Sequence, residues 1–313
     1  MKTAILIPCY NEAKTIKNVI EDFKKEMPDA EIYVYDNNST DGTDKIAEAA
    51  GAIVRYEYRQ GKGNVVRSMF RDIDADCYIM VDGDDTYPAS FAPKLEKLIL
   101  EDKADMAVGD RLSSTYFTEN KRAFHNFGNV LVRKLINIIF KSNLKDIMTG
   151  ARAFNRDFVK MYSICSKGFE IETEMTIFAL ENNFRIVETP IEYKDRIEGS
   201  ESKLNTYSDG FKVIKKIGTL FMQTKPFTFF SIITMIFLLI ALIFFTPVFI
   251  KFAQTGYVDK IPTLICVAGL GIIAVIIFFS GIILSVLKSE DRQNFERTFN
   301  IMRYMSEKND KNK

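Results

Sequence analysis

The sequence predicts an α/β domain with a mostly parallel sheet and helices on both faces, followed by two membrane-spanning helices. Two observations lead to this prediction. Over residues 1–110, short apolar runs alternate with segments of helical periodicity. Further along, Pro226–Ile250 and Ile261–Leu287 contain no charged side chain. A helix needs roughly 20 apolar residues to cross a bilayer, and both runs are long enough.

The elements of the first domain follow from these patterns. The expected strands are Lys2–Pro8, Ala30–Tyr35, Ile53–Tyr56, Cys77–Val81 and Met106–Val108, with a later one at Arg185–Tyr193. Helices are expected over Ala13–Met27, from a cap within Asp41–Asp44 through Ala50, from Gly61 to about Ile73, over Pro93–Glu101 and over Lys121–Phe140. Because the chain opens directly on a strand, we expect no signal peptide.

The stretch Cys77–Pro88, CYIMVDGDDTYP, carries the strongest chemical signal. Its strand ends at the carboxylates of Asp82, Asp84 and Asp85, which repel one another unless a cation lies among them. Oxygen ligands suit Mg²⁺ or Mn²⁺, and Mg²⁺ usually completes its coordination with phosphate oxygens and water. The stretch therefore predicts a metal site for a diphosphate. The alternative is a solvated Asp/Gly turn.

Polar clusters follow three of the expected strands, at Tyr10–Glu12, Asp36–Asp41 and Asp82–Asp85. In parallel sheets covered by helices, ligands bind at the carboxyl ends of the strands. We therefore expect the three clusters to face one crevice at the same edge of the sheet.

The charge balance and the rare residue types exclude several classes of function. The chain has 42 Lys and Arg against 41 Asp and Glu, a net charge of +1 that does not favour bulk nucleic-acid binding. The single histidine, His125, excludes sites built on several histidines and leaves carboxylates as the main candidates for a general base. We expect His125 at the surface or in an interface. The four cysteines lack CxxC spacing, which favours reduced, structural thiols.

Basic residues flank the two apolar runs unevenly. The connection between the runs carries only Lys251 and Lys260, whereas seven basic residues follow Leu287. The positive-inside rule then places both termini in the cytoplasm. We expect a cytoplasmic domain over 1–205, an amphipathic interfacial helix over 206–225, a hairpin over 226–287 with spans of about 227–250 and 262–287, and a basic cytoplasmic tail over 288–313. Gly269, Gly271 and Gly281 permit close packing of the two spans.

Four motifs in this order resemble glycosyltransferase family 2, which has the Rossmann-like GT-A fold. They are IPCYNE (Ile7–Glu12), YDNNSTDGT (Tyr35–Thr43), GKG (Gly61–Gly63) and VDGDDTYP (Val81–Pro88). The resemblance implies that the Asp-x-Asp motif binds Mg²⁺ or Mn²⁺ and the diphosphate of a nucleotide sugar. It also implies a binding site for the nucleotide sugar formed by Pro8, Tyr10, Glu12, Asp36, Asn37, Asp82 and Gly83. Lys62 contacts phosphate in this interpretation; the alternative is a simple helix start.

The second half is similar to the polyprenyl-phosphate glycosyltransferases of that family, such as dolichyl-phosphate mannose synthase and bactoprenol glucosyltransferase. The similarity rests on LKDIMTGARAFNRD (Leu144–Asp157), GFEIETEM (Gly168–Met175) and a membrane hairpin after the catalytic domain. It implies that Asp146 and Glu174 lie in the active site beside Asp84, and that the protein forms an oligomer such as a tetramer. Asp146 acts as a base, orients the acceptor or metal, or merely caps a helix. Glu172 is expected on a solvated face, because residues two apart on a helix do not share a face.

The implied reaction sets its own requirements. A phosphate monoester has a second pKa of about 6, so a lipid-phosphate acceptor is already ionised and needs no strong base. It does need cations to position it, and arginine can grip phosphate with two hydrogen bonds. The candidates are Arg111, Arg122, Arg133, Arg152, Arg196 and Lys203.

The resulting expectation is an inverting, metal-dependent transferase. It moves a sugar from a nucleoside-diphosphate sugar, preferably UDP-glucose or UDP-N-acetylglucosamine, to polyprenyl (undecaprenyl) phosphate at the cytoplasmic leaflet, for modification of cell-envelope glycans. One alternative is a membrane glycosyltransferase with a diacylglycerol or polysaccharide acceptor. Processive synthases carry more spans and a Gln-x-x-Arg-Trp motif, and this chain has no tryptophan. The other alternative is a non-catalytic scaffold that binds nucleotide sugars.

Overall fold

The computed structural model describes residues 1–113, 123–163, 166–168, 170–194, 218–219 and 221–311, with the side chains of 123–129, Glu307 and 309–311 excepted. The chain divides into two compact units, Met1–Ile214 and Lys215–Lys313. Most of the expected interfacial helix lies outside the described residues, as does the side chain of His125. The same holds for three of the expected phosphate ligands, Arg122, Arg196 and Lys203.

The first unit is built on a seven-stranded sheet with the order β3-β2-β1-β4-β6-β5-β7. β6 runs antiparallel to both of its neighbours, and the other pairs are parallel. The predicted α/β class is therefore confirmed. The strands are β1 (Thr3–Cys9), β2 (Glu31–Asp36), β3 (Ile53–Tyr56), β4 (Cys77–Met80), β5 (Met106–Asp110), β6 (Arg152–Asn155) and β7 (Ile186–Pro190).

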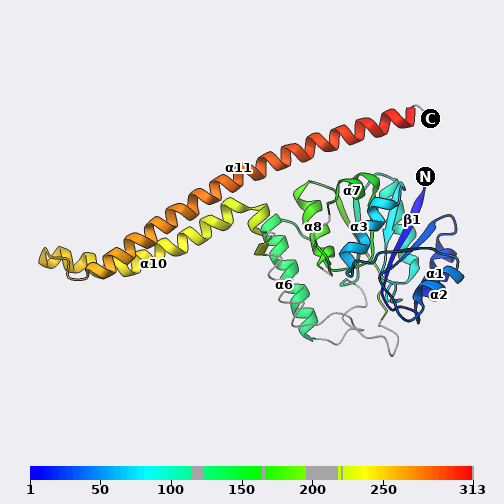
Figure 1. Ribbon diagram of the computed structural model, residues 1–313, viewed down its shortest axis with the longest axis horizontal. Helices are drawn as coiled ribbons and strands as arrows, with labels where there is room; N and C mark the ends of the chain where they lie inside the picture. Colours follow the sequence, from blue (N-terminus) through cyan, green and yellow to red (C-terminus); the bar gives the residue numbers. More distant parts are fainter. Residues whose placement is uncertain (114–122, 164–165, 169, 195–217, 220, 312–313) are drawn as a thin grey trace. The chain divides into compact units, whose positions relative to one another are not determined.

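Helices cover both faces of this sheet because side chains alternate along its buried strands. In β1, Ile5 and Ile7 face α1 (Ile16–Glu26), α2 (Thr43–Ala49) and α4 (Ala92–Leu100), the last preceded by the short η1 (Ala89–Phe91). Ala4 and Leu6 face α3 (Lys62–Asp72), α7 (Arg156–Met161) and α8 (Ile171–Glu181). Figure 1 shows α1 and α2 on one side of the strands and α3, α7 and α8 on the other. α6 (Ala123–Phe140) completes the unit.

Aromatic side chains fill the core on the α7 and α8 side. Phe158 of α7 stacks on Phe154 of β6 with ring centroids 4.9 Å apart, and it meets Phe178 of α8 edge-on at 5.5 Å. Removal of a buried phenylalanine side chain usually costs about 3–5 kcal/mol of stability. This packing holds α8, which carries two glutamates of the candidate site, firmly against the sheet.

The loops after β1, β2 and β4 meet at one rim, as expected. Cys9 at the end of β1 pairs with Asp36 at the end of β2. The sequence did not predict β6, which brings a fourth segment to the same rim. Arg152, its first residue, pairs with Met80 of β4 and with Val108 of β5. Because β6 is antiparallel, the loop that precedes it lies beside the carboxyl ends of its neighbours.

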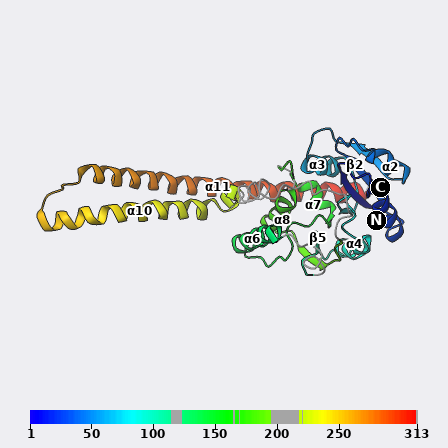
Figure 2. The same ribbon diagram turned by 90° about the horizontal axis from the view of Figure 1, so that it is seen from below.

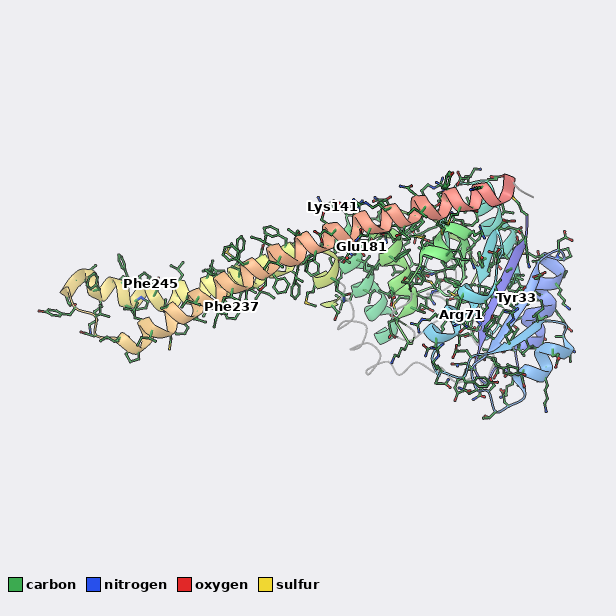
Figure 3. The ribbon with its side chains drawn as sticks, turned by 45° about the horizontal axis from the view of Figure 1, so that its top comes forward. Tyr33, Arg71, Lys141, Glu181, Phe237 and Phe245 are labelled. Atoms are coloured by element: carbon green, nitrogen blue, oxygen red, sulfur yellow. The ribbon has the colours of Figure 1, made fainter. Side chains whose placement is uncertain are left out.

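The second unit contains α10 (Pro226–Thr255) and α11 (Ile261–Lys311), which lie side by side in Figures 1 and 2. By length and composition both helices are able to cross a membrane. Large apolar side chains such as Leu239, Ile243 and Ile276 are 51%, 68% and 60% exposed within the chain. Figure 3 shows the side chains of this helical pair, with Phe237 and Phe245 labelled on α10.

Both helices extend beyond the apolar runs read from the sequence. α11 continues without a break through the basic segment that was expected as a tail. Of the three glycines expected to permit close packing, Gly281 alone lies against the partner helix in this described pair: a Cβ there would be 2.7 Å from Phe230 Cβ. Gly269 and Gly271 have nothing within 4 Å.

Candidate active site

The Asp-Gly-Asp segment lies after β4, against the end of β1. A Cβ on Gly83 would be 2.9 Å from Cys9 Sγ and 3.5 Å from Glu12 Cγ, so the close approach of the two loops requires glycine. Asp84 is 5% exposed, and one of its carboxylate oxygens accepts the Thr86 hydroxyl at 2.7 Å. The predicted metal-binding segment is therefore brought together with Glu12 at the rim of the sheet.

Lys62, the first residue of α3, connects this segment to α8. Its ammonium group lies 2.5 Å from a carboxylate oxygen of Asp82 and 2.5 Å from one of Glu172. Burial alone would lower the pKa of Lys62, but the two carboxylates outweigh burial and raise it. The ammonium group therefore stays charged, and it links two acidic residues that lie far apart in the sequence.

The glycines beside Lys62 explain how this contact forms. A Cβ on Gly61 would be 2.1 Å from the carbonyl oxygen of Lys167, and one on Gly63 would be 2.2 Å from that of Ser166. The Gly63 amide donates to the Lys167 carbonyl at 3.1 Å. The Gly-Lys-Gly motif thus lets the backbone before α8 pack directly on the start of α3, which brings Glu172 to Lys62.

The side of the rim where the sequence predicts nucleotide binding, here named the nucleotide side, lies at the ends of β1 and β2 and contains Pro8, Tyr10 and Asp36. Tyr10 is 39% exposed, whereas Asp36 is 4% exposed. One Asp36 carboxylate oxygen accepts the Ser39 amide at 2.9 Å. The other is buried and has no hydrogen-bond partner among the residues that the structure describes. A buried acceptor without a partner costs stability unless a ligand donates to it, so Asp36 is suited to a nucleoside hydroxyl or N–H group.

Asn37 has a different role from the one expected. Its side-chain amide donates to the carbonyls of Glu57 at 2.6 Å and Arg59 at 3.0 Å, and its oxygen accepts the Gly61 amide at 2.8 Å. Both amide protons are therefore used within the protein, and the side chain is 3% exposed. Asn37 fixes the loop that carries the Gly-Lys-Gly motif; it does not line a nucleoside pocket with a spare donor.

Asp146 and Arg111 form an ion pair on the other side of the rim. Arg111 Nε donates to the Asp146 carboxylate at 2.8 Å, and the guanidinium also donates to the Met148 carbonyl at 3.0 Å. The Arg111 side chain is 12% exposed and the Asp146 side chain is 2% exposed. Neither residue is a simple helix cap, and the structure brings these two expected site residues into direct contact.

Glu188 of β7 holds the loop that contains Asp146, a role that the sequence did not indicate. Its carboxylate accepts the backbone amides of Lys145 at 2.8 Å and Asp146 at 2.9 Å. Burial raises the pKa of Glu188, and the nearby negative charges add to this effect. The loop also reaches the predicted metal segment, because a Cβ on Gly150 would be only 2.4 Å from an oxygen of Asp82.

Arg152 does not present its charge to an acceptor, contrary to expectation. The side chain is 0% exposed, and its guanidinium donates to the carbonyls of Ile147 at 2.5 Å and Thr149 at 3.1 Å and to the Thr176 hydroxyl at 3.0 Å. A buried guanidinium is stable only when such acceptors surround it. Arg152 therefore braces the loop. Arg133 is in a different position, since its exposed guanidinium donates to the Lys145 carbonyl at 3.3 Å.

The two glutamates of α8 are both buried, with whole-residue exposures of 5% for Glu172 and 6% for Glu174. The sequence interpretation placed Glu174 in the site and Glu172 on a solvated face. In the structure Glu172 reaches Lys62, while Glu174 accepts the amide of Ser166 at 2.8 Å. The prediction that Glu172 lies on a solvated face was wrong, because Lys62 and the packed backbone cover this side chain.

The donor set at Asp82 and Asp84 fits a divalent metal ion whose coordination the substrate completes. No cluster of three or more His, Cys, Asp or Glu side chains suited to a metal occurs in the described ranges. Mg²⁺ commonly takes one or two carboxylates together with phosphate oxygens and water. These two carboxylates are therefore the residues that would hold Mg²⁺ or Mn²⁺.

Comparison with known proteins finds similar sequences among the glycosyltransferases. The chain is 34% identical to glycosyltransferase AglJ of Haloferax volcanii over 228 residues, covering 72% of this chain and 74% of the relative. It is 28% identical to the dolichyl-phosphate hexose transferase of the same organism, covering 68% and 91%. It is 25% identical to the undecaprenyl-phosphate mannosyltransferase of Micrococcus luteus, covering 66% and 88%.

Solved structures share the fold. Glucosyl-3-phosphoglycerate synthase from Mycobacterium tuberculosis, in complex with Mn²⁺, UDP-glucose and phosphoglyceric acid, aligns with a TM-score of 0.58 at 18% identity, covering 70% of this chain and 79% of that chain. The glycosyl transferase family 2 model matches residues 4–162, which contain all four motifs. The chain belongs to glycosyltransferase family 2 and has the GT-A fold.

Proposed function

We propose that this glycosyltransferase moves a hexose from a nucleoside-diphosphate sugar to a polyprenyl phosphate, with Mg²⁺ or Mn²⁺ held by Asp82 and Asp84. One observation carries the proposal. The Asp-Gly-Asp segment shares a rim with the Asp146–Arg111 ion pair, in a chain that also contains two helices able to cross a membrane. The names of two relatives, a dolichyl-phosphate hexose transferase and an undecaprenyl-phosphate mannosyltransferase, support the acceptor class.

The donor is bound by the nucleotide side of the rim in this proposal. The Asp36 oxygen that no described residue satisfies accepts a hydrogen bond from the nucleoside. Exposed Tyr10 directly follows Cys9, the residue that pairs with Asp36. Asp82 and Asp84 would hold a divalent metal ion, which when bound would supply positive charge to the diphosphate leaving group. Asp82 and Asp84 hold their positions because Gly83 and Gly150 let the neighbouring loops pack tightly around them.

The acceptor reacts without a dedicated base. An oxygen of the lipid phosphate forms a bond to the anomeric carbon as the bond from that carbon to the diphosphate breaks, which inverts the configuration. The phosphate is mostly ionised at neutral pH, so no proton needs to be removed. Asp146 is already paired with Arg111, which suits it to orient that arginine toward the acceptor phosphate rather than to act as a base.

The second unit supports a membrane location for the acceptor. Residues over α10 and over the apolar part of α11 present exposed aliphatic and aromatic side chains. We propose that these helices form a membrane hairpin with both termini in the cytoplasm, in accord with the distribution of basic residues. The cytoplasmic leaflet is then the place where the catalytic domain meets the lipid phosphate.

A transfer assay tests the proposal. The purified full-length protein in detergent, with Mn²⁺ or Mg²⁺, receives radiolabelled UDP-glucose, UDP-N-acetylglucosamine or GDP-mannose. Undecaprenyl phosphate, dolichyl phosphate and diacylglycerol are offered as separate acceptors. We expect an acid-labile, organic-extractable product from one donor with a polyprenyl phosphate, and with a UDP-sugar in preference to GDP-mannose. A product with diacylglycerol alone, or nucleotide binding without any transfer, would contradict the proposed acceptor or the proposed activity.

A further inference from the structure

Lys62 is placed as an internal cation of the candidate active site. Its ammonium group makes two contacts of equal length, 2.5 Å to Asp82 and 2.5 Å to Glu172. The exposed fractions of the three side chains differ: 9% for Lys62, 7% for Glu172 and 29% for Asp82. The ammonium and Glu172 are therefore enclosed by protein, whereas Asp82 is open to an incoming ion.

This arrangement creates a competition for Asp82. A divalent metal ion and an ammonium group repel each other strongly at short range, more so where water is partly excluded. The Lys62 ammonium occupies one oxygen of Asp82, and Gly150 packs close to the other. A metal ion that binds Asp82 must therefore compete with Lys62 for this carboxylate.

Glu172 offers Lys62 a second position. It projects from the first turn of α8, whose approach to α3 depends on Gly61 and Gly63. Because Glu172 is buried and Lys62 is its ion-pair partner there, the ammonium can leave Asp82 without losing its counter-charge. An ammonium left in this enclosed place without a carboxylate would carry a large desolvation cost.

We propose that Lys62 is a built-in counter-cation of Asp82, which a divalent metal ion displaces and which Glu172 then retains. Lys62 stabilises the metal-free site by neutralising Asp82, and it lowers the affinity of that site for metal in the absence of substrate. Glu172 is a positioning residue that acts through Lys62. This inference rests on the proposed metal site but not on the identity of the acceptor.

Titration with Mn²⁺ in the absence of any nucleotide tests the inference, with free Mn²⁺ measured by its electron paramagnetic resonance signal. Removing a positive charge from the side of a metal site strengthens metal binding. We therefore expect Lys62→Met in the full-length protein to bind Mn²⁺ at least about tenfold more tightly than the unmodified protein. Lys97→Met is the control, because Lys97 is 69% exposed and pairs with Glu101 on α4. It should leave the affinity unchanged.

Lys62→Gln keeps an N–H donor without the charge, and circular dichroism establishes that each variant is folded. Unchanged or weaker Mn²⁺ binding by a folded Lys62→Gln or Lys62→Met protein would overturn the inference.

Glu172→Gln separates a positioning role from direct metal binding. With Lys62 present, the variant removes the carboxylate that would retain the ammonium, so Mn²⁺ binding should weaken by about threefold or more. In the Lys62→Met background the same change should have much less effect, since Glu172 then has no ammonium to retain. An equal loss in both backgrounds would overturn the role assigned to Glu172. Because these titrations use no donor or acceptor, a failed transfer assay leaves their outcome intact.

Discussion

The two sides of the rim use their charged residues differently. On the nucleotide side, around β1, β2 and β4, Asp36 keeps a buried oxygen that no described residue satisfies, and Asp82 is still 29% exposed. On the side of β5, β6 and β7, Arg111 pairs with Asp146, and Arg152 is bound by its own loop. The first side keeps binding capacity for a ligand, whereas much of the charge on the second side maintains the shape of a loop.

If the nucleotide side keeps its binding capacity for a ligand, Asp84 should be needed for transfer, whereas the adjacent Asp85 should not. We expect Asp84→Asn to reduce transfer by about a thousandfold or more, because a neutral amide is a poor ligand for a divalent ion. Asp85→Asn is the matched control, since Asp85 has a φ of +58° and asparagine tolerates that conformation. It should stay within about threefold of the unmodified protein. Initial rates with the donor found in the transfer assay measure both variants, and equal losses in the two would contradict the metal site.

On the side of β5, β6 and β7, substitutions of Arg152 and Arg111 should have different effects on stability and on transfer. Arg152→Met leaves a cluster of carbonyls without their donor, so we expect a loss of about 3–5 kcal/mol in the free energy of unfolding. Arg111→Met should reduce transfer with a smaller effect on unfolding, because Arg111 lies at the edge of the site and is 12% exposed. Thermal unfolding followed by circular dichroism, together with transfer rates, separates the two. A stable but inactive Arg152→Met protein would return Arg152 to the list of acceptor ligands.

The predicted site residues that the structure brings to one rim share one property: they follow a predicted strand within a contiguous motif. Glu12, Asp36, Asp82 and Asp84 belong to this group, and the parallel sheet brings their loops together without further information. For Lys62 the sequence interpretation gave a contact with phosphate or a simple helix start; in the structure Lys62 begins α3 and pairs with Asp82 and Glu172. Gly61 and Gly63 pack against the backbone of the segment before α8, and the sequence does not identify that segment as their neighbour.

The interpretations that failed depend on the direction of single side chains. Arg152 and Arg111 both appeared as cations near a polar loop, but β6 turns the Arg152 side chain into its own loop. Glu172 and Glu174 are separated by roughly 200° around a helix, so the rotation of α8 decides which one meets Lys62. Tertiary packing sets this rotation, and no local pattern in Gly168–Met175 records it.

The tight approach at Gly63 gives a steric test of the nucleotide side. A Cβ there would lie 2.2 Å from the Ser166 carbonyl oxygen, so Gly63→Ala must push the segment before α8 away. We expect a loss of about 1–3 kcal/mol in the free energy of unfolding and a lower transfer rate. Gly269→Ala adds the same methyl group to a helix with nothing within 4 Å and should lower neither quantity, since alanine is favoured over glycine inside a helix. Full stability of Gly63→Ala would show that the two segments are less tightly coupled than this packing requires.

The smallest expected effect concerns two carboxylates, one on each side of the rim, whose pKa values move in opposite directions. The hydrogen bond from Arg59 lowers the pKa of Glu57 to about 2, and the Ser68 hydroxyl adds to this effect. Glu57 therefore contributes stability at neutral pH, which is lost as the pH falls from about 4.5 toward 2. Since Arg59 is 60% exposed, solvent screening makes this contribution small.

Burial raises the pKa of Glu188, so its contribution has the opposite sign: it is present below the unfolded pKa of about 4.5 and is lost as the pH rises through the folded value. Unfolding free energies measured between pH 7 and pH 3 compare each Gln variant with the unmodified protein. The stability advantage of the unmodified protein over Glu57→Gln should shrink as the pH falls, whereas its advantage over Glu188→Gln should grow. Parallel pH profiles for the two variants would mean that the two sides of the rim do not differ in the way their buried carboxylates are held.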